Sequence, residues 1–285
     1  MPSDLALTRG ALIADAAAVL EAAGIGGARR EALRLWAELP GGDVAAAMLF
    51  PGDPVGAEHA AAYASAVRRR AAGEPLAHVT GWVGFRHLTL RSDRRALIPR
   101  PETEGLVELV LARVPGGRVA DVGTGGGCIA LSLASEGRYD EVVAIELSPE
   151  ALSLAEENRR LTGARVALVR GDLCAPLAPG RLDALVSNPP YLTAAEYAAL
   201  DGSVRDWEPE AALAGGAEGL DVIARLLDEG RAVVRPGGWL ALEIDCARAA
   251  ICACRAGESG WTDVAIHADL FGRERYLLAQ RSEIP

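Results

Sequence analysis

The sequence predicts an α/β fold with a mostly parallel, seven-stranded sheet, preceded by a small helical domain. From residue 102 onward, stretches with helical periodicity alternate with short apolar runs that are typical of buried strands. Residues 5–39 and 56–72 instead show only helical spacing. A length of 285 residues, half of them hydrophobic, suits one large and one small domain, each with its own core.

The region between the two predicted domains differs in composition from both. Residues 79–98 mix aromatic, β-branched and basic side chains, which predicts a β-hairpin formed by "FRHLTL" and "ALI". The predicted boundaries are therefore a helical N-terminal domain at 1–78, a hairpin linker at 79–98 and a second domain at 99–285.

In the second domain, helices are predicted at 102–113, 127–136, 149–162 and 217–235. The predicted strands are "GRVADVG", "EVVAIEL", "ARVALV", "LDALVS" and "GWLALEI", followed by a terminal pair, "TDVAIHAD" and "RERYLLAQR". This alternation implies a sheet that helices cover on both faces.

Charge and cysteine usage narrow the class of protein. The formal net charge is −10, which argues against a protein that coats nucleic acid, because phosphate binding needs a basic surface. The five cysteines form no C-x-x-C pair, so neither a metal site nor a disulfide framework is predicted. The same cysteine pattern favours a reduced, cytoplasmic setting. No run of 18 apolar residues occurs, and we therefore expect no membrane segment.

A glycine-rich turn follows the first predicted strand of the second domain, in "ADVGTGGGCIAL". Gly123, Gly125 and Gly127 are spaced for a sharp turn that lets a ligand approach the backbone closely. The dinucleotide fingerprint would need a further glycine where Cys128 stands, so an NAD-dependent oxidoreductase is disfavoured.

Two acidic residues accompany this turn. Asp121 ends the strand before it, and Glu146 ends the next strand, where a carboxylate can accept hydrogen bonds from ribose hydroxyls. This pattern is typical of S-adenosylmethionine sites in Rossmann-like methyltransferases. Asp172 and Leu173, after the third strand, are then candidates for adenine contact, although Asp172 fits a helix N-cap nearly as well.

The fourth strand ends in "SNPPY", where open α/β sheets bind ligands. Pro189 and Pro190 have fixed φ angles and carry no N–H, and Pro189 holds Asn188 extended. The Asn188 side-chain oxygen and the Pro189 carbonyl can then both accept from one NH₂ group, while Tyr191 stacks on the flat group that bears it. Such a grip orients a poorly nucleophilic nitrogen for methylation. A proline-stiffened loop with a turn asparagine is the structural alternative.

Taken together, these motifs identify the chain as resembling bacterial peptide chain release factor N5-glutamine methyltransferases, over nearly its whole length. The resemblance rests on "GEPLAHVTG" (73–81), "LIPRPETE" (97–104), "DVGTGGG" (121–127), "SNPPY" (187–191) and "EPEAALAGGAEGLDVI" (208–223). It implies a Rossmann-like class I methyltransferase fold, S-adenosylmethionine as cofactor with S-adenosylhomocysteine as product, and the Gly-Gly-Gln loop of release factors as substrate.

The resemblance also implies roles for individual residues. The N-terminal domain would engage the release factor, and Asn188, Pro189, Pro190 and Tyr191 would hold its glutamine. The expected cofactor-binding residues are Arg100, Thr103, Asp121, Gly123, Thr124, Gly125, Gly126, Gly127, Glu146, Leu147, Asp172, Leu173 and Asn188.

Alternatives remain open on the sequence alone. NPPY chemistry also suits exocyclic amines of adenine or cytosine, and the basic run Arg86, Arg91, Arg94, Arg95 and Arg100 is the only support for a nucleic-acid substrate. His78, Asp245 and Leu173 depart from the family pattern, which leaves room for a paralogue acting on another protein glutamine. A degenerate, non-catalytic binding protein is a further alternative.

Overall fold

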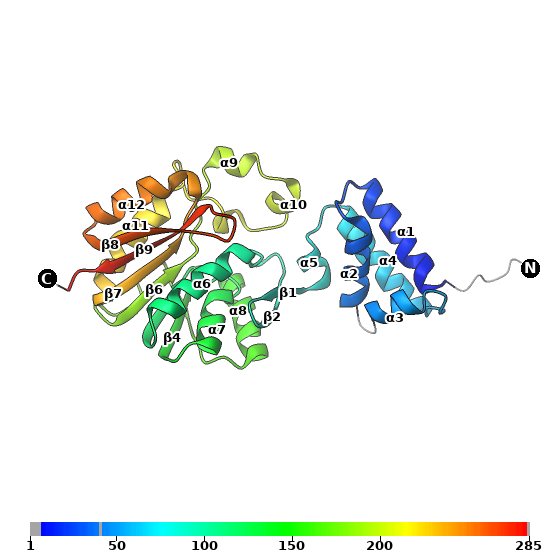
Figure 1. Cartoon of the computed structure of the whole chain (residues 1–285), viewed down its shortest axis with the longest axis horizontal. Helices are drawn as coiled ribbons and strands as arrows, with labels where there is room; N and C mark the ends of the chain where they lie inside the picture. The colour runs from blue at the N-terminus through cyan, green and yellow to red at the C-terminus, as the bar shows by residue number, and fades with distance from the viewer. Residues whose placement is uncertain (1–6, 40–41, 284–285) are drawn as a thin grey trace, which may run out of the picture. The chain divides into compact units, whose positions relative to one another are not determined.

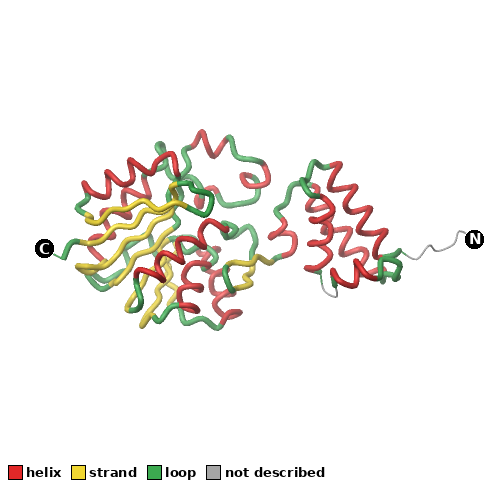
Figure 2. The backbone as a smooth tube through the Cα atoms, in the orientation of Figure 1, coloured by secondary structure: helices red, strands yellow, loops and turns green. Residues whose placement is uncertain are grey.

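The computed structural model describes residues 7–39 and 42–283, and the chain forms two compact units. One unit comprises the residues up to Gly81 together with Gly202–Trp207, and the other comprises Trp82–Asp201 and the residues from Glu208 onward. Figures 1 and 2 show helices in the first unit and a sheet flanked by helices in the second. The predicted helix start at residue 5 lies outside the described residues.

The N-terminal unit is a small bundle of helices around one core. Leu20, Leu35, Trp36 and Tyr63 are buried at its centre, and the Tyr63 hydroxyl donates to the Ala32 carbonyl at 2.8 Å. The helices of this unit are α1 (Arg9–Ala22), α2 (Ala28–Glu38), α3 (Val44–Leu49), α4 (Ala57–Ala71), α5 (Leu76–Thr80) and, from the later segment, α10 (Gly202–Arg205). The predicted helices in 5–39 and 56–72 are confirmed, whereas three short helices, α3, α5 and α10, were not predicted.

A β-hairpin opens the second unit, but it is shorter than predicted. Its strands are β1 (Trp82–Phe85) and β2 (Leu88–Arg91), which pair antiparallel, and Phe85 and Leu90 are buried. The predicted strand "ALI" is wrong, because residues 96–98 form no strand. The Ile98 N–H instead donates to the Glu208 carboxylate at 2.9 Å.

Seven strands form the sheet of the second unit, in the order β5-β4-β3-β6-β7-β9-β8. All neighbours pair parallel except β9, which runs antiparallel to β7 and β8. The strands are β3 (Gly117–Val122), β4 (Tyr139–Glu146), β5 (Ala167–Arg170), β6 (Leu182–Ser187), β7 (Val234–Glu243), β8 (Trp261–Ala268) and β9 (Glu274–Arg281). The predicted fold class and all seven predicted strands of this domain are confirmed.

Helices cover both faces of this sheet, because alternate strand residues point to opposite sides. Ala120 and Val122 pack toward α11 and α12, whereas Val119 packs toward α6 and α7. The helical elements of the unit are α6 (Pro101–Arg113), α7 (Cys128–Glu136), α8 (Pro149–Thr162), α9 (Ala194–Ala198), η1 (Glu210–Ala212), α11 (Asp221–Val233), η2 (Cys246–Arg248) and α12 (Ala249–Glu258).

The strand order places two functional segments side by side. The chain moves outward from β3 through β4 to β5 and then returns to β6 on the other side of β3. Open α/β sheets bind ligands at the carboxyl ends of the strands at such a switch point. Asp121 pairs with Val186, so the glycine turn after β3 and Asn188 after β6 emerge next to each other.

Within the described residues, no helix has the length and apolar character needed to cross a membrane, and no cluster of His, Cys, Asp and Glu could hold a metal ion. The five cysteines are all free thiols.

Alanine substitutions at two helical glycines are expected to change the free energy of unfolding in opposite directions. Gly105 in α6 lies against the buried Tyr276 ring, and an added Cβ would overlap its hydroxyl, which donates to the Glu102 carbonyl at 2.6 Å. Gly257 in α12 has no atom within 4 Å of an added Cβ. We expect Gly105→Ala to lower the free energy of unfolding by about 1–3 kcal/mol, and Gly257→Ala to raise it by at most ~1 kcal/mol. Urea denaturation of both variants tests this pair; stabilisation by Gly105→Ala would contradict it.

Candidate active site

The glycine turn after β3 is open on its outer side. Gly123, Gly125 and Gly127 have φ angles of 72°, 56° and 92°. Glycine adopts such positive φ angles easily, whereas a residue with a side chain would be strained there. A Cβ added at Gly123 would meet no atom within 4 Å, and one at Gly125 would come no closer than 3.8 Å to Ala96. The turn therefore offers bare backbone to a ligand.

The buried carboxylate of Asp121 is hydrogen-bonded to this turn. One of its carboxylate oxygens accepts from the Thr124 hydroxyl at 2.6 Å and from the Ala130 N–H, in the first turn of α7, at 3.0 Å. Its second oxygen has no hydrogen-bond partner among the described residues. The side chain is fully buried, and this burial raises the pKa of Asp121 to about 7. Asp121 thus ties the turn to the start of α7.

Glu146 ends β4 and holds the other side of the turn. Its two carboxylate oxygens accept from the Gly125 N–H at 2.8 Å and the Ser148 N–H at 2.9 Å. These bonds fix the carboxylate at the carboxyl edge of the sheet. Each carboxylate oxygen has a further lone pair that can accept from a ligand hydroxyl.

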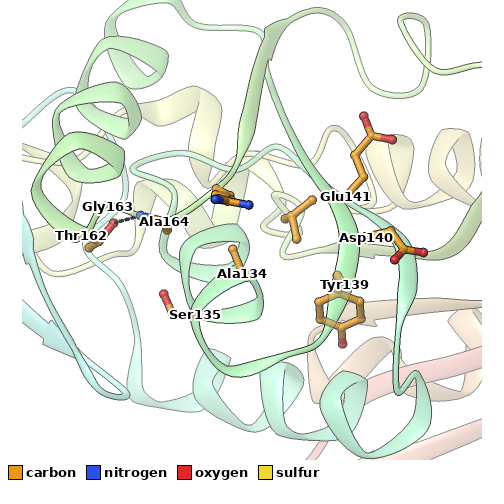
Figure 3. Close-up of a pocket in the computed structure, with 10 residues that line it drawn as sticks. Ala134, Ser135, Tyr139, Asp140, Glu141, Thr162, Gly163 and Ala164 are labelled. Carbon is orange, nitrogen blue, oxygen red and sulfur yellow. Dashed lines mark hydrogen bonds between the residues drawn. The ribbon is translucent and has the colours of Figure 1, made fainter.

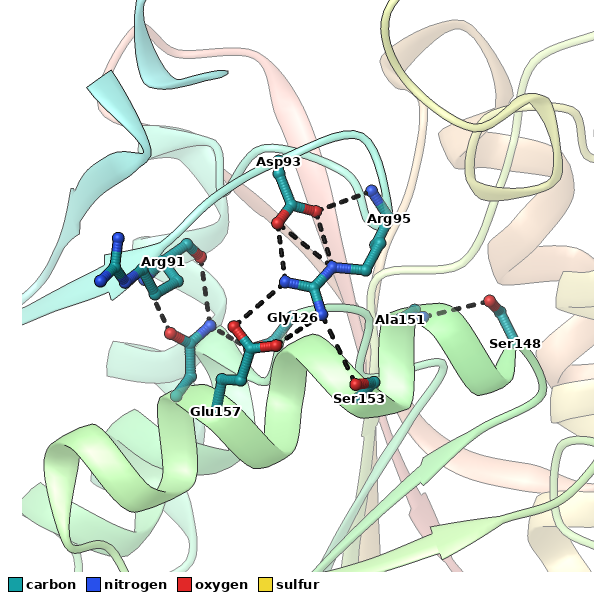
Figure 4. Close-up of polar contacts among 9 residues, drawn as sticks. Arg91, Asp93, Arg95, Gly126, Ser148, Ala151, Ser153 and Glu157 are labelled. Atoms are coloured by element: carbon teal, nitrogen blue, oxygen red, sulfur yellow. Dashed lines mark hydrogen bonds and ion pairs between the residues drawn. The ribbon is translucent and has the colours of Figure 1, made fainter. Parts of the chain in front are cut away.

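A buried asparagine on α8 connects the turn to the hairpin. The Asn158 NH₂ group donates to the Gly126 carbonyl at 2.9 Å and to the Arg91 carbonyl at 3.2 Å, while its oxygen accepts from the Arg91 N–H at 2.7 Å. Figure 4 shows these contacts beside the ion pair of Arg95 with Glu157. Because Asn158 is only 1% exposed, water does not replace these bonds.

Asn188 is oriented by a hydrogen bond to α6. Its Nδ2 atom donates to the Thr103 hydroxyl oxygen at 3.1 Å, while its Oδ1 atom accepts from none of the described residues. The preceding Ser187 donates to the Val122 carbonyl at 2.6 Å, which joins the end of β6 to the residue before the glycine turn. The Asn188 oxygen is therefore an unengaged acceptor beside that turn.

The residues after Asn188 continue along the same edge. Pro189 is buried and Pro190 is half-buried. Tyr191 packs against the core that also contains α11, and burial raises its pKa to about 12. A phenol in this state stays neutral and offers an aromatic face rather than a charge.

Residues 213–219 pack against the loop that follows Asn188, and glycines in this segment allow close backbone contact. The Leu192 N–H donates to the Leu213 carbonyl at 3.0 Å, and the Gly215 N–H donates to the Leu192 carbonyl at 2.8 Å. A Cβ at Gly215 would overlap the Pro190 carbonyl and come within 2.9 Å of the Tyr191 backbone. The same holds at Gly219, where a Cβ would overlap the Tyr191 carbonyl.

Comparison with known proteins identifies the family. The chain is 43% identical to a release factor glutamine methyltransferase of Deinococcus radiodurans over 95% of this chain and 98% of the relative. It is 41% identical to the protein of the same name from Cereibacter sphaeroides, over 92% and 94% of the two chains. The chain belongs to the release factor glutamine methyltransferase family. The predicted resemblance is confirmed.

Domain comparisons agree with this family, and a structure comparison agrees with the fold. Residues 102–201 match the methyltransferase small domain, and residues 11–81 match the PrmC N-terminal domain. The fold is similar to that of a methyltransferase from Pyrococcus furiosus, with a TM-score of 0.53 and 22% identity over 68% of this chain and 88% of that one. The matched methyltransferase domain and the names of these relatives confirm the predicted enzyme class, a glutamine methyltransferase.

The predicted cofactor-binding residues also include Leu147, Leu173, Asp172 and Arg100. Leu147 is 60% exposed beside Glu146, and Leu173 adopts a φ of 44°. The alternative of a helix N-cap at Asp172 is wrong, because no helix starts there and its carboxylate pairs with Arg225 at 2.9 Å. Arg100 pairs with Glu208 at 2.6 Å.

Several residues that shape the site were not predicted. Glu243 ends β7 and accepts from Thr103 at 2.7 Å, and Glu208 is a buried partner of Arg100. Glu243 could have been found by the criterion used for Glu146, a carboxylate at the end of an apolar strand. Asn158 gives no such sign within its amphipathic helix. The unexplained Asp245 caps η2 by accepting from the Ala247 N–H at 2.7 Å.

A cavity of about 340 Å³ lies elsewhere, between the start of β4 and the loop after α8 (Figure 3). Residues 139–142 and 162–165 line it. Because this is the amino edge of the parallel strands, the cavity is separate from the site described above.

Gly215→Ala is expected to impair catalysis by displacing the Asn188 loop. The added Cβ must push the Pro190 and Tyr191 backbone away, which shifts the reacting groups by a fraction of an ångström or more. Misplacement on that scale costs roughly 10²-fold in turnover. We expect kcat to fall by about this factor, with Gly257→Ala as a control close to wild type. Unchanged kcat for Gly215→Ala in steady-state assays would contradict this role.

Proposed function

We propose that this protein methylates the side-chain amide nitrogen of the glutamine in the Gly-Gly-Gln loop of peptide chain release factors, with S-adenosylmethionine as methyl donor. The observation that carries the proposal is the oriented amide of Asn188, whose free oxygen lies at the switch point beside the glycine turn. Membership of the release factor glutamine methyltransferase family supports the substrate.

The residues around the glycine turn suit S-adenosylmethionine. Gly123 and Gly125 leave room above the backbone, and Glu146 offers oxygens for ribose hydroxyls. Leu147 is an exposed apolar side chain next to Glu146, and we propose it and Leu173 for contact with the adenine. When bound, the cofactor supplies an electrophilic methyl group on its sulfonium. The turn has no pyrophosphate to bind, which agrees with the non-glycine at Cys128.

Asn188 and Pro189 would act on the substrate amide. The Oδ1 atom of Asn188 and the carbonyl of Pro189 are acceptors, and each would accept a hydrogen bond from one N–H of the glutamine NH₂ group. These two hydrogen bonds would direct the nitrogen lone pair away from the acceptors and stabilise the positive charge that develops during methylation. The C–S bond of the donor breaks as the N–C bond forms, and the methylated nitrogen, now acidic, loses one proton to solvent. Tyr191, neutral and partly buried, packs beside the planar carboxamide.

The N-terminal unit is proposed to recognise the release factor. We retain 1–78 as this recognition domain, 79–98 as the linker that contains the hairpin, and 99–285 as the methyltransferase domain. Since release factors act in translation, the cytoplasm is the proposed location.

A nucleic-acid substrate gains no support from the basic run. Arg86 pairs with Glu136 at 2.6 Å, Arg95 with Glu157 at 2.6 Å and Arg100 with Glu208 at 2.6 Å. Arg91 stacks on the Trp82 ring at 3.9 Å. Arginines already paired with carboxylates are poor phosphate ligands, because those pairs must first be broken.

Cofactor affinity should depend on the turn and on Glu146. Gly123→Ala strains a backbone with φ of 72° and places a methyl group where the ligand would lie. Glu146→Ala removes two charge-assisted hydrogen bonds that shape the turn. We expect each variant to weaken S-adenosylmethionine binding by roughly 10- to 100-fold, measured by titration calorimetry. Glu141→Gln, at the amino edge of the sheet, serves as the control. Wild-type affinity for both site variants would refute this assignment.

The substrate assignment is tested with radiolabelled S-adenosylmethionine. We expect label to pass to a release factor but not to its loop Gln→Ala variant, nor to DNA or RNA. Asn188→Ala should lower kcat by roughly 10²-fold or more, because an acceptor for the transition state is lost, while the Kd for S-adenosylmethionine changes little. Label on nucleic acid or on the Gln→Ala variant would defeat the proposal.

A further inference from the structure

Three polar side chains from separate elements form a hydrogen-bonded chain that ends at Asn188. Glu243 is the last residue of β7, Thr103 lies in the first turn of α6, and Asn188 follows β6. The Thr103 Oγ1 atom lies 2.7 Å from Glu243 Oε2 and 3.1 Å from Asn188 Nδ2. Glu243 and Thr103 are 1% and 2% exposed, so solvent does not take part in these bonds.

The direction of this chain depends on the charge of Glu243. A hydroxyl has a single hydrogen, and an ionised carboxylate only accepts. With Glu243 ionised, Thr103 must donate to it, so the Thr103 oxygen can only accept and selects the NH₂ side of Asn188. With Glu243 protonated, the carboxylic acid can donate to Thr103, whose hydrogen is then available to the Asn188 oxygen.

We propose that Glu243 is a positioning residue that acts through Thr103 to fix the amide orientation of Asn188, so that Oδ1 rather than NH₂ faces the substrate. The inference rests on the proposed function, in which Oδ1 accepts from the glutamine NH₂ group. If the side-chain amide of Asn188 were flipped, its NH₂ group would face the NH₂ group of the substrate glutamine. The substrate nitrogen would then lose a hydrogen-bond acceptor. Glu243 itself touches no substrate.

The surroundings of Glu243 bring the pKa of its carboxyl group close to neutral pH. Burial raises the pKa of Glu243 to about 7, against the opposing effects of the Thr103 hydrogen bond and of nearby arginines. The charged or titratable groups that face it are Arg100 and Glu102 at the start of α6, Arg275 and Tyr276 on β9, Tyr191 after β6 and Cys128 on α7. Turnover should therefore rise as pH increases through about 7, because the ionised form becomes dominant.

Kinetics of matched variants test the positioning role. Glu243→Gln keeps the size of the side chain but removes the charge, and Thr103→Val removes the hydroxyl. We expect either change to lower kcat by about tenfold or more and to flatten its pH dependence between about 6 and 8. Glu243→Gln should in addition leave the Kd for S-adenosylmethionine within about twofold. Thr103→Ser, which restores the hydroxyl, should recover turnover and pH dependence relative to Thr103→Val. Glu141→Gln is the carboxylate control.

Nuclear magnetic resonance provides a readout that does not require activity. In the wild type, the side-chain amide signals of Asn188 should shift with a midpoint near pH 7, and this shift should be absent in Glu243→Gln. The signals are assigned by their loss in Asn188→Asp. If the wild type transfers no methyl group to a release factor but the titration occurs, the proposed function fails and the positioning role stands. Asn188 signals that do not respond to pH, or a wild-type kcat profile in Glu243→Gln, would overturn the inference.

Discussion

The site depends on the parallel pairing of β3 with β6. Asp121 lies opposite Val186, so two chain segments that are 65 residues apart end at the same level of the sheet, and the Ser187 hydroxyl joins them at the Val122 carbonyl. A register shift by one residue would turn every side chain of β6 to the other face. The glycine turn and Asn188 are therefore neighbours because of strand register, not because of contacts they make with each other.

Glycines around this edge serve two distinct purposes. In the turn after β3, their positive φ angles bend the backbone and their missing side chains leave it open. At Gly215 the requirement is close approach alone, since an added Cβ would overlap the Pro190 carbonyl. Gly219 meets both requirements, because its φ is 71° and an added Cβ would overlap the Tyr191 carbonyl. The "GG" and "GLD" stretches that support the family resemblance thus have a physical cause: they form the surface on which the Asn188 loop rests.

The sequence predicted what depends on local pattern and missed what depends on distant partners. Strand periodicity located all seven strands of the sheet, because each is an apolar run bounded by turns. The false strand "ALI" is also apolar, and Ala96 and Ile98 are indeed buried, but the Ile98 N–H bonds to Glu208 instead of to a strand. The partners of Glu208, Glu243 and Asn158 lie far along the chain, so spacing gave no indication of them.

The buried carboxylates at this edge are best understood as parts of the site's frame. Removing a carboxylate from water is costly unless hydrogen bonds compensate, so a fold selected only for stability would avoid such groups. Asp121 and Glu243 are both almost fully buried, and burial raises both pKa values to about 7. Each bonds a threonine hydroxyl, Thr124 or Thr103, next to a segment that the reaction needs. Perturbed carboxylates that gather at a switch point indicate function more than stability, and here they determine the shape of the turn and the direction of the Asn188 amide.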